Sequence, residues 1–243
     1  MSQSLTIRPS GLALGNDCSI QNLTPDNAWA SGTELWVGFT GGGKYRTLID
    51  FDLTGVREGK AGIPFGATIL TASLSLYVAT AAGSAASSRI ALVRADALVD
   101  DALATWNRWD GVRAWITAGG DYDAATQVTW TMPTSGSALS ITGLASLVQT
   151  ALDRRSGRCC FLLKQNDETA ANVLKVGRSG AAYNATPRAP ALILTYNPIS
   201  ADTNEPSDPP TDYDEIQDIA TTTGWGDGIG DARVFRSAAP ASP

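Results

Sequence analysis

Three pairs of aspartates have the type and spacing that acid–base chemistry could use: Asp50/Asp52, Asp100/Asp101 and Asp121/Asp123. A glycosidase needs two carboxylates about 5 to 9 Å apart across a cleft, and sequence spacing alone does not establish such a separation. Asp50 and Asp52 lie at i and i+2 of one expected strand, directly before Thr54 and Gly55, so turn capping or calcium binding explains them without catalysis. We therefore expect structural roles for these carboxylates.

The chain of 243 residues contains no histidine and three cysteines, Cys18, Cys159 and Cys160. Without histidine, the chain alone cannot build a Ser-His-Asp or Cys-His nucleophile or a histidine-ligated metal site. Three poorly spaced cysteines do not form a four-thiolate zinc site or a disulfide framework, and we expect them to be reduced, half-buried strand residues. The sequence thus favours a protein that is not an enzyme and has neither a cofactor nor a metal.

The segment Gly38-Phe-Thr-Gly-Gly-Gly-Lys44-Tyr45 is similar in composition to a phosphate-binding loop. Such a loop needs a Ser or Thr after the lysine and a helix to follow, whereas Tyr45 and an expected strand occupy these places. We interpret residues Thr40 to Gly43 as a hairpin loop whose glycines adopt positive φ.

Three tryptophans and two arginines fall within the ten residues Trp106-Asn-Arg-Trp109-Asp-Gly-Val-Arg113-Ala-Trp115. Exposed indole faces stack on sugar rings and arginine binds carboxylates, so Trp109, Arg113 and Trp115 are candidates for binding an acidic polysaccharide. The alternative is that Trp106 and Trp115 fill the core while the arginines are solvated, as is usual for large aromatic residues.

Charge is unevenly distributed along the chain. Residues 1–197 carry 16 basic and 15 acidic side chains, whereas residues 198–243 carry two basic and nine acidic ones. The body therefore has no basic stripe for a phosphate backbone, and we expect no nucleic-acid partner. Residues 198–216 form an acidic, proline-rich linker that cannot bury enough apolar surface to fold.

Beyond the linker, residues 217–243 combine apolar and basic side chains, as a docking arm would. The candidate partner-binding residues are Trp225, Ile229, Arg233, Val234, Phe235 and Arg236. Aromatic and arginine side chains often anchor protein interfaces, so this arm is expected to bind a neighbouring subunit.

Before residue 198 the dominant hydrophobic period is two, which is typical of strands with one buried face. The expected strands are residues 34–39, 45–53, 72–78, 89–94, 128–132, 159–164, 173–178 and 191–196. One helix is expected, capped by Thr142, with Leu144, Leu147, Val148, Ala151 and Leu152 at helical spacing and Gly157 after its end. The fold class is therefore all-β: residues 1–197 form an antiparallel β-sandwich or jelly roll with one short helix, followed by the extended C-terminal arm.

Several of these segments resemble the DNRLRE domain family. They are Pro25-Asp-Asn27, Leu35-Trp-Val-Gly38, Arg46-Thr-Leu-Ile-Asp-Phe-Asp-Leu53, Gly66-Ala-Thr-Ile69 with Ala72–Tyr77, Ala104-Thr-Trp-Asn107, and Gly119-Gly-Asp121. The resemblance covers about residues 5–197 and implies a β-jelly roll with a short helix. That family is similar to a carbohydrate-binding module family with members that recognise alginate. Asn27 and Ala30 depart from its usual first-loop pattern, so we carry over the fold and no binding site.

The N-terminus shows no signal peptide, and the sequence has no apolar run long enough for a membrane span. Proteins of the resembling family also include parts of phage virions, which are made in the host cytoplasm. We therefore expect a non-enzymatic phage virion structural protein, a head decoration or tail appendage, that binds other virion proteins or itself as a homo-oligomer through its C-terminal arm. The alternative is a carbohydrate-binding module for an acidic host polysaccharide.

Overall fold

The computed structural model describes residues 1–9, 17–29, 33–55, 61–136, 138–177 and 188–199. The chain divides into two units, Met1–Ile199 and Ser200–Pro243, of which the second lies outside the described residues. The elements of the first unit are β1 (Gln3–Ile7), β2 (Asp17–Gln21), β3 (Glu34–Thr40), β4 (Gly43–Asp52), β5 (Thr68–Ala82), β6 (Ala86–Val93), β7 (Tyr122–Met132), β8 (Ala138–Ile141), α1 (Ala145–Arg154), β9 (Arg158–Gln165), β10 (Asn172–Gly177) and β11 (Ala191–Asn197).

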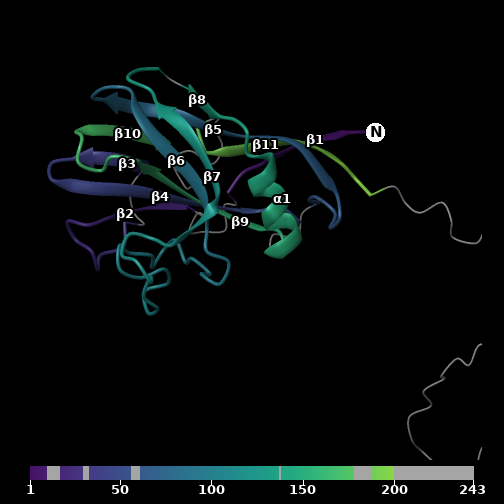
Figure 1. The fold of residues 1–243 in the computed structure, drawn as a ribbon, viewed down its shortest axis with the longest axis horizontal. Coiled ribbons are helices and arrows are strands. Elements are labelled where there is room, and N and C mark those ends of the chain that lie inside the picture. The colour runs from purple at the N-terminus through teal and green to yellow at the C-terminus, as the bar shows by residue number, and fades with distance from the viewer. Residues whose placement is uncertain (10–16, 30–32, 56–60, 137, 178–187, 200–243) are drawn as a thin grey trace, which may run out of the picture. The chain divides into compact units, whose positions relative to one another are not determined.

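All described strand pairs are antiparallel, and they form one curled sheet in the order β1-β11-β5-β10-β3-β4-β9-β6-β7. β2 pairs with β4, and β8 pairs with β5. The 15-residue strand β5 links the two halves of the sheet, because its first part pairs with β11 and its last part with β10. Figure 1 shows how strongly the sheet curls. The fold is thus all-β and of the sandwich or jelly-roll type, as the sequence predicts.

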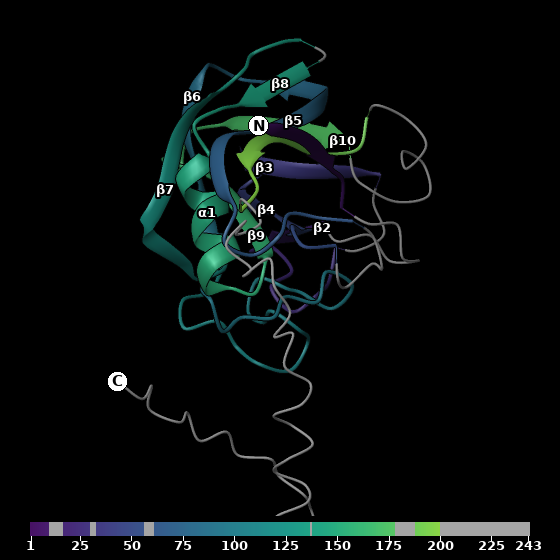
Figure 2. The same cartoon turned by 90° about the vertical axis from the view of Figure 1, so that its right-hand side faces the viewer.

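The main core lies between the inner faces of the curled sheet. It is lined by alternate residues of the strands, and Phe51 and Phe161 meet at its centre with ring centroids 6.1 Å apart. The single helix closes one end of this core through Leu147, Val148, Ala151 and Leu152, which are all buried. Figures 1 and 2 both place α1 beside β7 and β9.

The expected helix is confirmed, but its expected cap is wrong. α1 begins after Leu144, and no side chain bonds to its first turn, so Thr142 does not cap it. At the other end, the Gly157 amide donates to the Ala151 carbonyl with φ of 75°, which is the glycine-terminated end that the sequence predicts.

The glycine-rich segment forms a hairpin between β3 and β4, as expected. Thr40 pairs with Gly43, and the two residues between them, Gly41 and Gly42, have φ of 58° and 80°. Two consecutive positive φ values define the turn that matches the twist of a two-residue hairpin, and glycine adopts them without steric cost. This backbone contains no helix N-terminus that could hold a phosphate.

All eight expected strands are present, with bounds that differ by a few residues. Three further strands, β1, β2 and β8, were not predicted. These strands are short, with five, five and four residues, so the polar and apolar alternation of Ser4–Ile7 and Asp17–Gln21 extends over too few positions to stand out.

Candidate functional site

The loop Arg94–Asp121 between β6 and β7 is the largest feature outside the main core, and it crosses the outer face of β2, β4 and β9. Its tryptophans pack with outward side chains of these strands in a second hydrophobic core. The strand residues of this core are Cys18, Ile20, Leu48, Val93, Cys160 and Leu162. Figure 1 shows the loop below β2 and β9. The buried residues of the loop therefore pack against the sheet, and this packing holds the exposed residues of the loop in place.

The three tryptophans of the loop are buried, with 8%, 7% and 5% of Trp106, Trp109 and Trp115 exposed. Trp109 and Trp115 meet edge to face at 5.7 Å, and the Trp115 indole N–H donates to the Thr105 carbonyl at 3.0 Å. The expectation that Trp109 and Trp115 present open faces to a sugar is therefore wrong, because strands and neighbouring rings cover them. The alternative interpretation, that such rings fill a core, agrees with the structure.

Arginines line the tryptophan cluster. The guanidinium groups of Arg94 and Arg113 lie 5.4 and 5.5 Å from the Trp109 ring centre. Arg113 also pairs with Asp110 at 2.6 Å, yet its side chain remains 57% exposed. Of the three residues proposed for sugar binding, Arg113 alone faces solvent.

Two aspartates fold the loop by accepting hydrogen bonds from its backbone. Asp110 accepts from the amides of Val112 and Arg113 at 3.0 and 2.7 Å. Asp121 accepts from the amides of Ile116 and Thr117 at 2.6 and 2.7 Å. A carboxylate that receives several amide protons fixes a turn. These bonds set the backbone on both sides of the exposed residues Val112 and Ile116.

A buried ion pair joins β4 to the β9–β10 connection, and its arginine also bonds to the loop. Arg46 of β4 makes two bonds of 2.7 Å to the Glu168 carboxylate and a third, of 2.6 Å, to the Gly119 carbonyl. Its guanidinium lies 4.7 Å from the Trp106 ring centre. Burial would raise the pKa of Glu168, but the hydrogen bonds and charge of Arg46, with the charge of Lys164, outweigh it and hold that pKa below its ordinary value.

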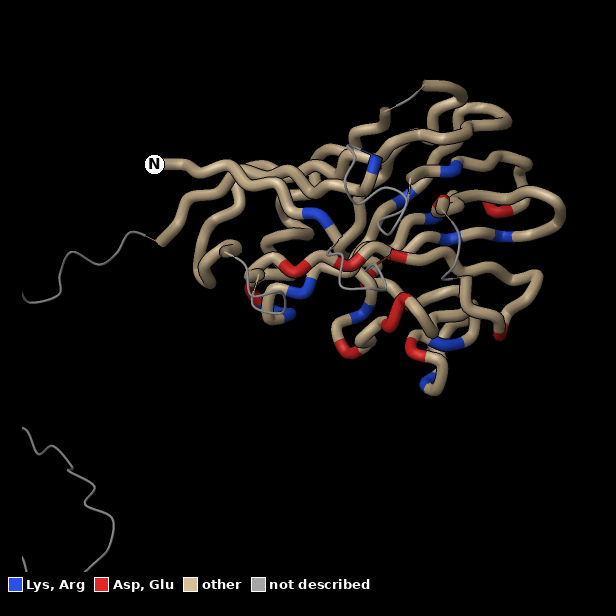
Figure 3. Tube along the Cα trace, turned by 180° about the vertical axis from the view of Figure 1, so that it is seen from behind, with Lys and Arg blue, Asp and Glu red and all other residues tan. Residues whose placement is uncertain are grey.

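Further cations surround this pair. Lys164 lies 3.5 Å from Glu168 and 5.8 Å from the Tyr122 ring centre, while Arg89 donates to the Tyr122 hydroxyl at 3.2 Å. Burial, followed by the positive charge of Arg46, lowers the pKa of Lys164. In Figure 3 charged residues gather around these strands and the loop. By contrast, β1, β5, β8 and β11 contain no charged residue.

The aspartate pairs that first suggested acid–base chemistry make structural contacts. Asp52 accepts from the Thr54 hydroxyl and the Gly55 amide at 3.0 and 3.1 Å, which confirms its role as a turn cap. Asp50 accepts a hydrogen bond from Arg158 at 2.8 Å, Asp100 accepts one from the Ala102 amide at 3.0 Å, and Asp123 forms an ion pair with Arg155 at 3.7 Å. Each of these aspartates thus secures a turn or a neighbouring arginine.

Exposed apolar side chains concentrate on the same loop. Among the described residues ten large hydrophobic side chains are exposed, and four of them belong to this loop: Leu98, Leu103, Val112 and Ile116. Val112 and Ile116 are each 81% exposed. We call these four residues the loop surface. Exposed apolar side chains that gather into one patch are characteristic of a protein contact surface.

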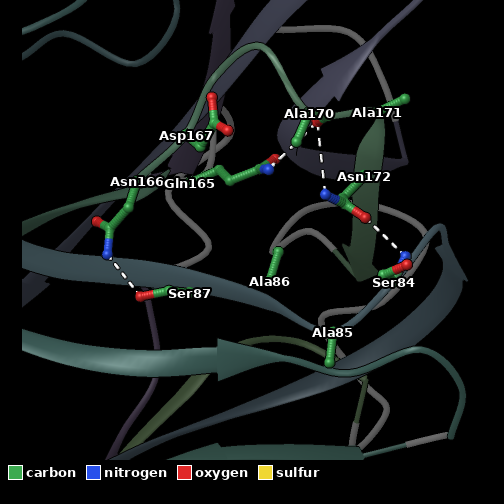
Figure 4. Close-up of a pocket in the computed structure, with 10 residues that line it drawn as sticks. All are labelled: Ser84, Ala85, Ala86, Ser87, Gln165, Asn166, Asp167, Ala170, Ala171 and Asn172. Carbon is green, nitrogen blue, oxygen red and sulfur yellow. Dashed lines mark hydrogen bonds between the residues drawn. The ribbon is translucent and has the colours of Figure 1, made fainter.

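A second feature is an open pocket of about 420 Å³ between the β5–β6 and β9–β10 connections. Figure 4 shows its lining, which is made of Ser84–Ser87, Gln165–Asp167 and Ala170–Asn172. Asn166 donates to the Ser87 hydroxyl at 2.7 Å, and Asn172 accepts from the Ser84 amide at 2.6 Å. These bonds tie the two connections together, and Asp167 is the charged residue of the lining.

The three cysteines are free thiols, as expected, but they are buried rather than half-buried. Burial raises the pKa of Cys159 well above its ordinary value. Within the described ranges, no group of three or more cysteine or acidic side chains could hold a metal ion. The described part of the chain also has no helix with the length and apolar character of a membrane span.

The predicted linker 198–216 falls outside the described residues except at its first two positions. The arm 217–243, with its six candidate partner-binding residues Trp225, Ile229, Arg233, Val234, Phe235 and Arg236, lies outside them entirely. Partner binding by this arm stays a prediction.

Comparison with family models finds no match for the chain, and comparison with curated proteins finds no significant relative. The resemblance to the DNRLRE domain accordingly stays a prediction from the sequence.

Proposed function

We propose that this protein is a non-enzymatic structural component of a phage virion, in which the body Met1–Ile199 is a rigid module that contacts another virion protein. The observation that carries this proposal is the loop surface: four exposed apolar side chains on one loop whose base is fixed by a second core. A patch of exposed apolar side chains lowers the solubility of a protein, and such patches are commonly found where a partner protein covers them. A head decoration or tail appendage is a protein of this kind.

The C-terminal arm supplies a second contact in this proposal. Its support comes from composition: an acidic, proline-rich stretch is followed by Trp225, Ile229, Val234 and Phe235 with two arginines between and beside them. Aromatic and arginine anchors on an extended segment are a common means of attaching one subunit to another.

The proposal is tested by changing Val112 and Ile116 to Asp together in the phage that encodes the chain. Both side chains are 81% exposed, so the fold and its thermal midpoint should be retained. Because two charges would be placed against an apolar partner, the amount of the protein in purified particles should fall at least about tenfold, equivalent to about 1.4 kcal/mol. Thr117→Asp, on the same loop and also exposed, is the control and should be incorporated normally.

Binding of an acidic polysaccharide is the second candidate, and the exposed guanidinium of Arg113 is the observation that favours it. Normal incorporation of the Val112/Ile116 variant would count against the loop surface. Retention of the wild-type chain on an alginate gel, lost in Arg113→Ala, would then favour the second candidate.

A further inference from the structure

The strands at the two ends of the sheet differ in length. β1 is at one end with five residues, and β7 is at the other with eleven. Among the described strands, β7 pairs with β6 alone, so one side of its backbone has no strand partner. Figure 2 shows β7 at the outer boundary of the sheet, with no described segment beyond it. A long free edge is a template for a further strand.

β7 lacks the devices that normally prevent such pairing. From Ala124 to Met132 it contains no charged residue and no proline, and its register with β6 is regular from Gln127 to Met132. The charge at its beginning, Asp123, lies 3.7 Å from Arg155 of the same chain. Natural edge strands are usually short, charged, bulged or interrupted by proline. β1 and β8 meet the first condition because they have five and four residues. The register of β7 with β6 shifts between Tyr122 and Gln127, but from Gln127 to Met132 β7 has no bulge, charge or proline.

The side chains of β7 suit pairing with an identical strand. Its outward row consists of Ala125, Gln127, Thr129 and Thr131, all exposed and uncharged, while Val128, Trp130 and Met132 belong to the core side. A two-fold axis perpendicular to the sheet brings β7 antiparallel to β7 of a second copy. The outward rows of the two copies then lie side by side on the same face of the joined sheet. No like charges then meet between Ala124 and Met132, and facing threonine or glutamine side chains can exchange hydrogen bonds.

We infer that the free edge of β7 pairs antiparallel with β7 of a second copy, which joins two bodies into one continuous sheet with two-fold symmetry. The occupant is a second copy because the edge is self-complementary: it is uncharged, regular and long enough for several backbone hydrogen bonds. This inference deepens the proposed function by naming one partner of the module, and it rests on that function only for its biological setting.

The test uses the full-length chain and its mass in solution over a concentration series, measured by light scattering and sedimentation. The wild-type protein should reach about twice the chain mass of 25.3 kDa. Replacing both Thr129 and Thr131 with Lys puts four positive charges across the two-fold axis, so the dissociation constant should rise at least tenfold and the protein should become monomeric. Both positions are exposed, and an unchanged thermal midpoint will show that the fold is kept.

Two comparisons make the test specific to β7. The matched control replaces Ser4 and Thr6 of β1 with Lys, two exposed positions with the same spacing at the other edge, and should leave the dimer intact. A 1:1 mixture of the Thr129→Lys/Thr131→Lys chain with a Thr129→Glu/Thr131→Glu chain should restore association, because unlike charges now face each other.

A wild-type chain that stays monomeric at every concentration would overturn the inference, as would a dimer unaffected by the Lys pair on β7 or a mixture that fails to associate. Its failure can be told apart from failure of the proposed function. A monomeric chain that is still incorporated into particles through the loop surface would remove β7 pairing and leave the virion proposal standing.

Discussion

At the scale of single residues, Arg46 connects the sheet to the loop, and Glu168 of the β9–β10 connection holds the Arg46 side chain in place. The Arg46 guanidinium donates two hydrogen bonds to the Glu168 carboxylate and a third to the Gly119 carbonyl. The side chains of Arg46 and Glu168 are both about 90% buried. Such a pair adds little net stability over apolar residues of similar size, but removing one partner leaves a buried charge without compensation. The pair therefore acts mainly by fixing where the loop sits.

Glu168→Gln should lower the free energy of unfolding by about 3 kcal/mol, because Arg46 would keep its charge in a buried position. Asp96→Asn is the control: Asp96 also pairs with an arginine, Arg94, but its side chain is 68% exposed and solvent screens the pair, so the loss should be much smaller than in Glu168→Gln. Chemical denaturation of the three proteins measures both values. Equal losses would contradict the special role of the buried pair.

The same pair makes a prediction about pH. The folded pKa of Glu168 lies below its ordinary value of 4.5, so the pair stabilises the fold fully above that value. This stabilisation is lost as the pH falls below about 4.5 and through the folded pKa, because the folded state must then take up a proton. The difference in unfolding free energy between wild type and Glu168→Gln should therefore shrink below pH 4.5 and be constant near neutral pH.

At the scale of elements, the loop Arg94–Asp121 depends on a close approach of its backbone to the sheet. Gly119 has φ of 93°, and a Cβ there would lie 2.6 Å from an Arg46 nitrogen and 2.7 Å from the Trp106 ring. Glycine is thus needed for two reasons, the backbone conformation and the absence of a side chain. The second core and the ion pair both meet at this residue.

Gly119→Ala should therefore destabilise the protein by about 2–4 kcal/mol, from backbone strain together with overpacking. Gly136 is a matched control, since it has φ of 118° but no atom within 4 Å of its Cβ position. Gly136→Ala should cost only about 1 kcal/mol from the backbone. Thermal and chemical denaturation compare the two, and a similar loss in both variants would show that the loop does not depend on close packing at Gly119.

Much of the fold follows from the sequence because strands such as β5 bury one face and leave the other more exposed, which imposes a period of two on Ala72–Val78. The glycine pair of the β3–β4 hairpin and the apolar stripe of α1 are equally local signals. The candidate site is different. Arg46 and Glu168 are 122 positions apart, and no local pattern joins them; a signal exists only in the i, i+4 spacing of Lys164 and Glu168. Burial of Trp109 depends on which strands lie beneath the loop, and the spacing of the tryptophans in the sequence does not show which strands these are.

At the scale of the whole molecule, the described body separates its charged and uncharged surfaces. Charged residues occur in the loop and in strands β4, β6 and β9, whereas β1, β5, β8 and β11 have none (Figure 3). The loop surface and the β7 edge are both free of net charge and exposed. Two such surfaces would let the body contact a copy of itself and a different protein, as the proposed role in a virion requires.

The most direct test of this account is the copy number of the chain in purified particles of the phage that encodes it, measured by quantitative mass spectrometry against a major virion protein. The account predicts a fixed, stoichiometric copy number that survives washing in high salt, because the proposed contacts are apolar and backbone-mediated. A chain that is absent from particles, or present only in traces that washing removes, would contradict the account.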